Sequence, residues 1–284
     1  MPELRTRYLD LTVADINMKG IGREIPHVVF SVEKTLKKHP NTCEVAIWNL
    51  NPDHRAALEE LRPKKNDARG IPCSIHAGYQ NYYGQIFNGD LRSAWSIYEK
   101  PNWVTHLSSG DGEKSYRRAR IKRSFGRKTS VSTALKAILD ELGLGTGNLT
   151  KIESELSQLG ATSYFEYGKV MSGSCVKHLD DLVRSSGLEW SIQDGTIQFL
   201  KQGKPLDGEV IRLSPSTGLI GSPTVDNKGV LTAGMLMIAD VRLGGLVVMD
   251  ASRVKGTHRI EKANWKGDTL AKSDWTISIE GKRA

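Results

Sequence analysis

The sequence predicts a mainly β protein of the α+β class, and three observations lead to this expectation. Apolar and polar residues alternate over much of the first 107 residues, which is typical of strands with one buried face. Between residues 130 and 187 the apolar spacing becomes helical. After residue 204 the alternation returns. We therefore expect two β sections separated by a section that contains helices.

The first β section begins with a predicted hairpin. Two strands are expected over residues 27–33 and 43–47, separated by the turn-forming residues 39–41. A short helix is expected to begin at Asn51, because this capping residue precedes Pro52, and proline at the first helical position favours a helix start. The section is therefore expected to hold one helix among its strands.

Three more strands complete this section in the prediction, over residues 71–77, 84–91 and 103–107. Gly78 and Gly89 are expected at bends or bulges, where the missing side chain relieves strain. This strand spacing is typical of a small barrel or sandwich.

The middle section contains the helices. The most regular helical pattern covers residues 130–142, with Gly143 as its expected C-terminal stop. A second helix is predicted to begin at Thr150, because Thr150 and Glu153 are spaced to cap each other's free amides. A third is predicted over residues 174–186.

A hairpin follows the third predicted helix directly. Residues 188–193 (LEWSIQ) and 196–200 (TIQFL) flank Asp194-Gly195, the strongest hairpin signal in the chain. We therefore expect helices packed on a small sheet in this section.

The closing section is predicted to be all β. Its four expected strands are residues 230–238, 246–251, 256–265 and 274–280. Four strands are few for a closed barrel, so the strand before residue 126 is expected to complete it. The prediction is therefore an N-terminal barrel over residues 1–106, a discontinuous second barrel over 107–126 and 205–284, and an α+β insertion over 127–204.

The positive charge of the chain is local. The net charge is +8, but residues 116–128 hold seven basic residues and no acidic one, which leaves only +1 for the rest. Three cations in this run alternate with Ala119 and Ile121, as in a strand with one apolar face. They are Arg118, Arg120 and Lys122. The row is either solvated, turned to another subunit, or in contact with a polyanion.

Little in the sequence supports catalysis. The seven histidines are scattered without a ligand spacing, no GxSxG elbow is present, and the glycines of residues 143–147 follow a helix instead of joining a strand to one. Three distant cysteines encode neither a disulfide framework nor a CxxC site. We predict no catalytic residue, no cofactor and no metal site. No apolar run of about 18 residues predicts a membrane-spanning segment, so a soluble protein is expected.

Several short motifs occur together in an order and spacing that match a known family. They are CEVAIWNL (43–50), QIFNGD (85–90), LEWSIQ (188–193), GLIGSP (218–223) and WKGD (265–268). In these the chain resembles the phage baseplate hub proteins, which belong to the tail-tube-like barrel family of contractile-tail phages and related injection systems. The resemblance covers nearly the whole chain.

The resemblance implies two tail-tube-like β-barrel domains in each chain and a homotrimer that forms a ring of pseudo-sixfold symmetry. Such a ring joins the sixfold tail tube to the threefold central spike. It implies five kinds of partner: further copies of this chain, the tail tube or distal tube protein, the central spike protein, other baseplate proteins and the end of the tape-measure protein. The expected location is the tail baseplate of the virion, after assembly in the host bacterial cytoplasm.

The family supplies no catalytic residues, so the chain is expected not to be an enzyme. Because the last predicted strand lies close to Ala284, fused spike or lytic domains are expected to be separate chains. In a ring, Arg118, Arg120 and Lys122 become candidates for docking an acidic neighbour or lining the channel. Two alternatives stay open: a nucleic-acid-binding protein that uses the basic strand 116–128, and a cell-envelope hydrolase of the tail tip.

Overall fold

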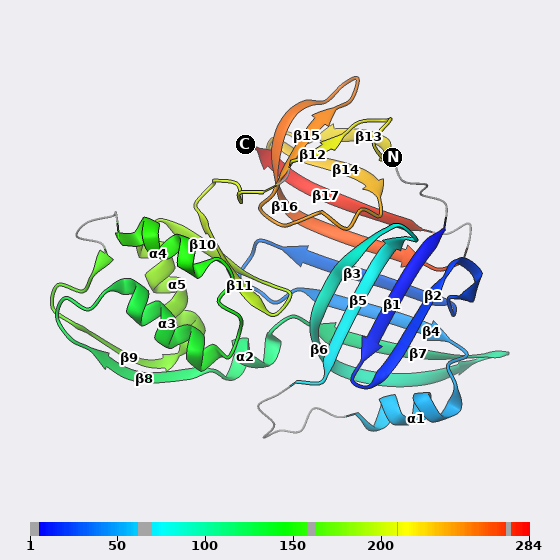
Figure 1. Ribbon diagram of the computed structural model, residues 1–284, viewed down its shortest axis with the longest axis horizontal. Helices are drawn as coiled ribbons and strands as arrows, with labels where there is room; N and C mark the ends of the chain where they lie inside the picture. The colour runs from blue at the N-terminus through cyan, green and yellow to red at the C-terminus, as the bar shows by residue number, and fades with distance from the viewer. Residues whose placement is uncertain (1–5, 62–69, 158–162, 209, 271–273) are drawn as a thin grey trace. The chain divides into compact units, whose positions relative to one another are not determined.

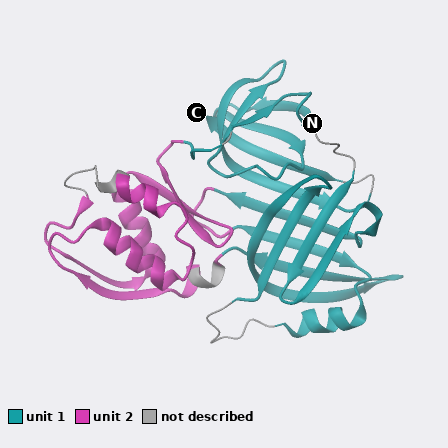
Figure 2. Cartoon of the chain, in the orientation of Figure 1, with its two compact units in different colours: residues 1–35, 41–111, 205–284 teal, residues 36–40, 112–204 magenta. Residues whose placement is uncertain are grey.

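The structure is a computed structural model that describes residues 6–61, 70–157, 163–208, 210–270 and 274–284 (Figure 1). The chain forms two compact units (Figure 2). Unit 1 comprises Met1–Thr35, Asn41–Asp111 and Pro205–Ala284, and unit 2 comprises Leu36–Pro40 and Gly112–Lys204. Strands predominate over helices, so the predicted mainly β class is confirmed. No helix in the described part of the chain is long and apolar enough to cross a bilayer.

Unit 1 is built on one 13-stranded sheet that contains strands from both ends of the chain. Its strands are β1 (Arg7–Val13), β2 (Ile16–Ile21), β3 (Val28–Thr35), β4 (Thr42–Trp48), β5 (Pro72–Tyr79), β6 (Tyr82–Glu99), β7 (Asn102–Gly110), β12 (Ile211–Leu213), β13 (Leu219–Val225), β14 (Val230–Leu236), β15 (Leu246–Asp250), β16 (Lys255–Asp268) and β17 (Trp275–Arg283). The order is β13-β14-β17-β16-β3-β4-β7-β6-β5-β1-β2, and β12 joins through β15, which pairs with β16.

Strand β16 connects the early strands of the sheet to the late ones. One edge of β16 pairs with β17. The other edge pairs first with β15, over residues 255–259, and then with β3, over residues 262–268. The two β sections of the sequence are therefore parts of a single hydrogen-bonded sheet.

The sheet curls around its core. The indole N–H of Trp275 on β17 donates to the carbonyl oxygen of Gly78 on β5, across 2.9 Å in the interior, although these strands are far apart in the sheet order. Phe30 lies edge-on to Trp275, with ring centroids 5.5 Å apart. In Figure 1, β1 and β5 cross in front of β3 and β4. Alternating apolar side chains of these strands and of β6 are buried in the core; they include Leu9, Leu11, Phe30, Ile47, Ile75 and Phe87.

The early predicted elements of unit 1 are present. Strands β3, β4 and β5 cover the segments predicted over residues 27–33, 43–47 and 71–77. Helix α1 (Pro52–Glu60) begins as expected, because the Asn51 side chain accepts a hydrogen bond from the Asp53 N–H across 2.8 Å.

Unit 2 encloses its helices between two small sheets. Its elements are α2 (Glu113–Arg118), β8 (Arg120–Phe125), α3 (Val131–Leu142), α4 (Leu149–Ser157), β9 (Lys169–Ser174), α5 (Cys175–Ser185), β10 (Leu188–Gln193) and β11 (Thr196–Lys201). Helices α3 and α5 pack on each other; α3 also contacts β8, and α5 contacts both β9 and β10. The core between them is apolar and includes Leu135, Ile138, Met171, Leu179, Ile192 and Phe199.

The predicted helix and hairpin boundaries of unit 2 are largely confirmed. The Ser130 hydroxyl caps α3 by accepting from the Thr133 N–H at 3.1 Å, and Gly143 ends the helix with a φ of 64°. The turn between β10 and β11 has positive φ at Asp194 and Gly195, as a two-residue hairpin turn requires. Helix α4 begins at Leu149, so Thr150 lies within its first turn and is not its cap.

The pairing predicted for the basic strand is wrong. Strand β8 pairs antiparallel with β9, with Ile121 opposite Gly173, and not with the final strands of the chain. The physical reason is that Ile121 is buried in the helical core of unit 2, where it is only 2% exposed. Strand β9, which directly precedes α5, lies beside it and provides the hydrogen-bonding edge. Residues 107–110 belong to β7, which pairs with β4 and β6. The late strands of unit 1 join the sheet through β3 instead, and its division into two closed barrels stays a prediction.

Candidate functional site

The cations predicted from the sequence lie on the small β8–β9 sheet of unit 2. Arg120 and Lys122 are exposed on its outer face, while Ile121 points inward, so the predicted alternation is confirmed for these three residues. Further cations follow on the same strands and the adjoining turn. We call this set the basic ribbon: Arg120, Lys122, Arg123, Arg127, Lys128 and Lys169.

Arg118 does not belong to the row. It is the last residue of α2, so the helical backbone ends there and the alternation begins only at Arg120. The Arg120 guanidinium donates to the carbonyl oxygens of Arg117 and Ala119, across 3.0 and 3.1 Å. The structure therefore places two of the three predicted cations on one face.

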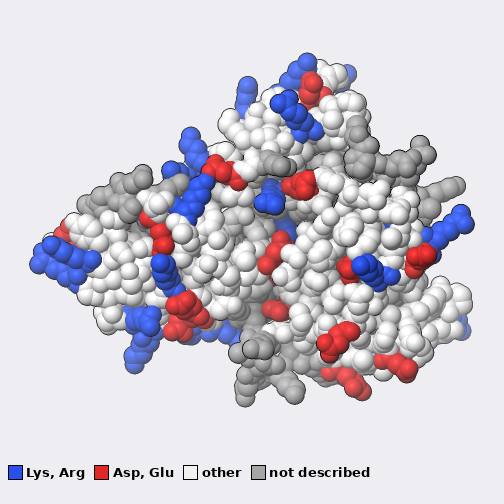
Figure 3. Space-filling model, viewed as in Figure 1, with Lys and Arg blue, Asp and Glu red and all other residues white. Residues whose placement is uncertain are grey.

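The basic ribbon is accompanied by exposed apolar groups. Val170 on β9 is 72% exposed and lies opposite Ser124 of β8, and Tyr167, just before β9, is 92% exposed. Figure 3 shows Lys and Arg side chains in several separate groups, with Asp and Glu side chains between them. The visible face is therefore mixed in charge.

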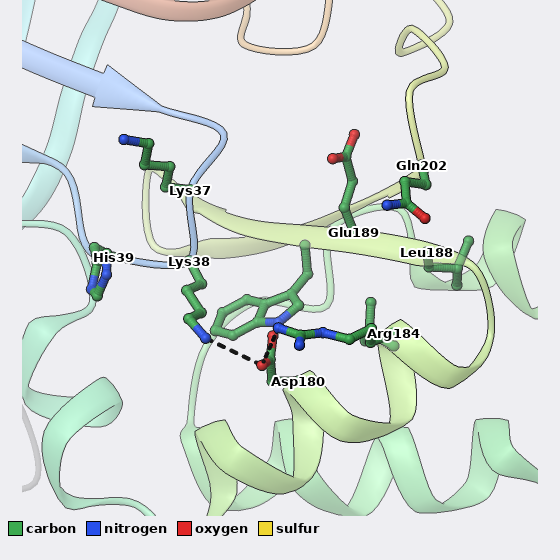
Figure 4. A pocket seen from close by; sticks show the side chains of 10 residues that line it. Lys37, Lys38, His39, Asp180, Arg184, Leu188, Glu189 and Gln202 are labelled. Atoms are coloured by element: carbon green, nitrogen blue, oxygen red, sulfur yellow. Dashed lines mark hydrogen bonds and ion pairs between the residues drawn. The ribbon is translucent and has the colours of Figure 1, made fainter.

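A polar pocket of about 350 Å³ lies within unit 2, between the segment 36–40, α5 and β10 (Figure 4). Asp180 on α5 accepts from Lys38 across 3.2 Å and from Arg184 across 3.0 Å. The ion pair with Lys38 attaches the segment 36–40 to α5. Sequence reasoning could place Asp180 on a polar helix face, but the partner lies 142 positions away and no local pattern marks it.

Trp190 also lines this pocket. Its side chain is 5% exposed, and its indole N–H is buried without a hydrogen-bond partner. This burial indicates that Trp190 is part of the core of unit 2. An unpaired buried donor costs free energy.

Within the described residues, no group of three or more His, Cys, Asp or Glu side chains could hold a metal ion. All three cysteines are free and buried, and burial raises the pKa of the Cys73 and Cys175 thiols to about 11. At neutral pH these thiols stay protonated, and a protonated thiol is a poor nucleophile.

Unit 1 exposes large apolar side chains on its longest hairpin. Residues 91–99 of β6 extend beyond the part that pairs with β5 and pair with β7 instead. Four side chains of this hairpin are between 39% and 50% exposed: Trp95, Ile97, Tyr98 and Trp103. Trp95 stacks on His106, with ring centroids 5.2 Å apart, and the Arg55 guanidinium lies 4.1 Å from the centre of the Trp103 ring. Clustered exposed aromatics of this kind are uncommon on a monomer surface.

The sheet of unit 1 also has open ends. Strands β2 and β13 are the last strands of the sheet order, and each pairs on one side only within the described residues. Open strand edges can pair with other chains, so proteins usually protect or use them. The unit thus combines a curled sheet, open strand edges and an exposed aromatic hairpin.

This architecture is the fold of phage-type tail proteins. The 43 kDa tail protein of prophage MuSo2 from Shewanella oneidensis matches with a TM-score of 0.65 at 10% identity, over 98% of each chain. The tail protein from Neisseria meningitidis MC58 matches with a TM-score of 0.61 at 10% identity, over 98% of this chain and 96% of that one. A component of the Escherichia coli type VI secretion system, described as similar to T4 bacteriophage tail proteins gp27 and gp5, matches with a TM-score of 0.55 at 8% identity, over 96% and 76%.

The sequence itself identifies the family. A search of curated proteins finds no match. The sequence model of the family described as baseplate hub gp41 matches residues 16–256, which is most of the chain. The protein belongs to this baseplate hub family, so the resemblance found in the sequence is confirmed.

Proposed function

We propose that the protein is the structural hub of a phage tail baseplate, and that three copies form a ring that joins the sixfold tail tube to the threefold central spike. The observation that carries the proposal is the match of residues 16–256 to the baseplate hub family. The fold shared with tail proteins over 96% or more of this chain supports it.

The proposed partners are the other two copies, the tail tube or distal tube protein, the central spike protein, other baseplate proteins and the end of the tape-measure protein. The likeness to a type VI secretion component that is itself similar to gp27 and gp5 supports a position beside the tube and spike. The proposed location is the virion baseplate, after assembly in the host cytoplasm.

We place the two tube-like modules on either side of the β3–β16 ladder. Strands β1–β7 would form the first module and β12–β17 the second, so three chains would supply six modules around the channel. The pairing of β16 supports this division. One part of its edge pairs with β15 of the second module, and the next part of the same edge pairs with β3 of the first. The basic strand has no part in the second module, because it pairs with β9.

Ring formation would also account for the open edges and the aromatic hairpin of unit 1. Permanent assemblies bury on the order of 2,000 Å² or more, and their interfaces are rich in apolar and aromatic groups. A surface exposing Trp95, Ile97, Tyr98 and Trp103 is suited to such burial.

Oligomeric state is the direct test. The full chain is measured by size-exclusion chromatography with light scattering at micromolar concentration, alone and after co-expression with the proposed central spike protein. A mass of three chains is expected in at least one condition. A single chain in both conditions would contradict the ring, because a partner that favours the ring stabilises it by mass action.

The proposal includes no catalysis. Purified chain incubated in a gel containing peptidoglycan is expected to produce no clearing, with lysozyme as the positive control. Clearing that disappears when one carboxylate is replaced would instead support the hydrolase alternative.

A further inference from the structure

A cationic pocket of about 580 Å³ lies in unit 1, where β13, the turn between β15 and β16, and the end of β17 meet. The lining residues that bear polar or charged side chains are Ser222, Thr224, Arg253, Lys255, His258 and Arg283. Three of these residues are permanent cations, and none is a carboxylate. The pocket is therefore built for negative charge.

A bulge in β13 shapes one wall of this pocket. Ile220 pairs with Gly234 and Thr224 pairs with Thr232, so two extra residues of β13 are accommodated between these pairs. Gly221 within the bulge has a φ of 68°, which glycine adopts without strain. The bulge brings the hydroxyl-bearing residues Ser222 and Thr224 and the buried Pro223 to the lining.

His258 supplies an unused polar group. The residue is 5% exposed, and its Nδ1 atom is buried with no hydrogen-bond partner. It lies directly opposite Arg283 of β17, so the two side chains share one face of the sheet. A buried ring nitrogen without a partner is costly, and a ligand that paired with it would recover that cost.

Arg253 and Arg283 also lack partners. Both are exposed, and neither guanidinium group makes a hydrogen bond or an ion pair with any described residue. Lys255 approaches Asp250 at 3.7 Å, but both side chains are more than 70% exposed, so that pair holds neither group firmly. Within the described part of the chain, the two guanidinium charges of the pocket are therefore uncompensated.

We propose that this pocket binds an acidic segment of a protein partner, with Arg253 and Arg283 pairing with its carboxylates and the protonated imidazole of His258 donating through Nδ1 to one of them. Guanidinium groups bind carboxylates in bidentate geometry, and a charge-assisted bond to the imidazole would fix the segment's position. The apolar lining residues Pro223, Val225 and Val254 would contact aliphatic groups between the acids.

Two considerations select a protein segment over a free phosphate or a nucleic acid. The volume and the apolar lining exceed what an inorganic anion needs, and they match a short peptide with mixed side chains. The choice also rests on the proposed hub function, in which the neighbours are proteins. Phosphate and DNA are therefore the competing ligands in the test.

The test measures the binding of a fluorescein-labelled hexapeptide of alternating glutamate and valine to the full chain, by fluorescence polarisation at low salt. The double variant Arg253→Glu/Arg283→Glu is expected to weaken binding by roughly tenfold or more. The matched control Arg23→Glu/Lys266→Glu reverses two exposed cations of unit 1 outside the pocket, and we expect it to stay within about twofold of the wild type.

Two further measurements address the histidine and the ligand class. His258→Phe keeps a ring but removes the donor, so it is expected to weaken peptide binding by several-fold, and His258→Asn, which restores an N–H, is expected to recover part of it. Equal affinity of the pocket variant and the wild type, or tighter binding of inorganic phosphate or duplex DNA at this site, would overturn the proposal.

A failure of the pocket proposal can be distinguished from a failure of the hub proposal. The oligomeric mass of each variant is measured in the same samples. Trimers that fail to bind the peptide would remove only the pocket proposal, whereas peptide binding by a chain that never forms trimers would remove only the ring.

Discussion

The side-chain amide of Asn41 donates to the carboxylate of Asp111 across 3.2 Å, and both residues are buried, at 3% and 0% exposure. The Asp111 N–H donates to the Asn41 carbonyl oxygen at 3.2 Å, and the Thr35 N–H donates to the Asn41 side chain at 2.9 Å. Thr35, Asn41 and Asp111 are the residues of unit 1 at three of the points where the chain passes between units. These buried hydrogen bonds thus hold together three of the points at which the chain leaves or enters unit 1.

Replacing Asn41 with alanine is expected to lower the free energy of unfolding by about 2–4 kcal/mol, because it leaves the Asp111 carboxylate and the Thr35 N–H short of partners in the interior. Urea denaturation followed by far-UV circular dichroism measures the loss. Asn227→Ala, at an exposed turn, is the control and is expected to change it by less than about 0.5 kcal/mol. Equal losses in the two variants would contradict the structural role given to Asn41.

The two buried tryptophans of the late strands provide a second comparison. Trp275 donates to the Gly78 carbonyl oxygen, whereas the indole N–H of Trp265 is buried without a partner. Trp275→Phe is therefore expected to cost about 1–3 kcal/mol more than Trp265→Phe in thermal or urea unfolding, because only the first leaves a carbonyl unpaired. A larger loss for Trp265→Phe would show that the bond between β17 and β5 does not stabilise the curl of the sheet.

Much of the local structure could be predicted from the sequence. Local patterns predict helices α3 and α5 and the hairpin β10–β11. The apolar spacing and the turn residues that specify each of them lie within about 15 consecutive positions. Strands β1 and β2 were not predicted, although Leu9, Leu11 and Val13 alternate and are buried in the structure. The charged residues around this segment obscured the pattern.

Strand partners could not be predicted in the same way. Strand β8 has the apolar alternation of any half-buried strand, and nothing in that pattern distinguishes β9 from the final strands as its neighbour. The cationic pocket was missed for a related reason. Arg253, His258 and Arg283 are unremarkable in the sequence, and only the register of β16 against β17 and the bulge of β13 bring them together.

The stability of the fold is expected to depend on the ionisation of His258. Burial, and after it the positive charge of Arg283, lowers the pKa of His258 below 6.5, while a hydrogen bond with the Gly256 backbone acts in the opposite direction. The unfolded chain therefore binds a proton first as pH falls, so this contribution to stability is complete above about pH 6.5 and is lost at lower pH.

Urea midpoints measured between pH 7.5 and 5 test this dependence on His258. The wild type is expected to lose stability as pH falls through this range, and His258→Asn is expected to show a smaller loss. His54→Asn, at an exposed position on α1, is the control. A slope that His258→Asn leaves unchanged would assign the loss to other groups.

The three cations predicted from the sequence permit a test of the nucleic-acid alternative. The triple variant Arg118→Glu/Arg120→Glu/Lys122→Glu is expected to fold normally, with a melting temperature within about 3 °C of the wild type, because Arg120 and Lys122 are exposed. For a hub, we expect duplex DNA binding by the wild type to be weak and to disappear between about 50 and 200 mM salt. Micromolar or tighter binding at 200 mM salt that the triple variant abolishes would favour the alternative.

The antiparallel ladder between β3 and β16 has a mechanical consequence. Its seven residue pairs, from Lys262 opposite Thr35 to Asp268 opposite Val29, join strands that come from opposite ends of the chain. Tension along these strands loads all seven pairs in shear, so they must rupture together instead of opening one after another. Tension along β3 and β16 is thus carried between the early and the late strands of the chain by this ladder.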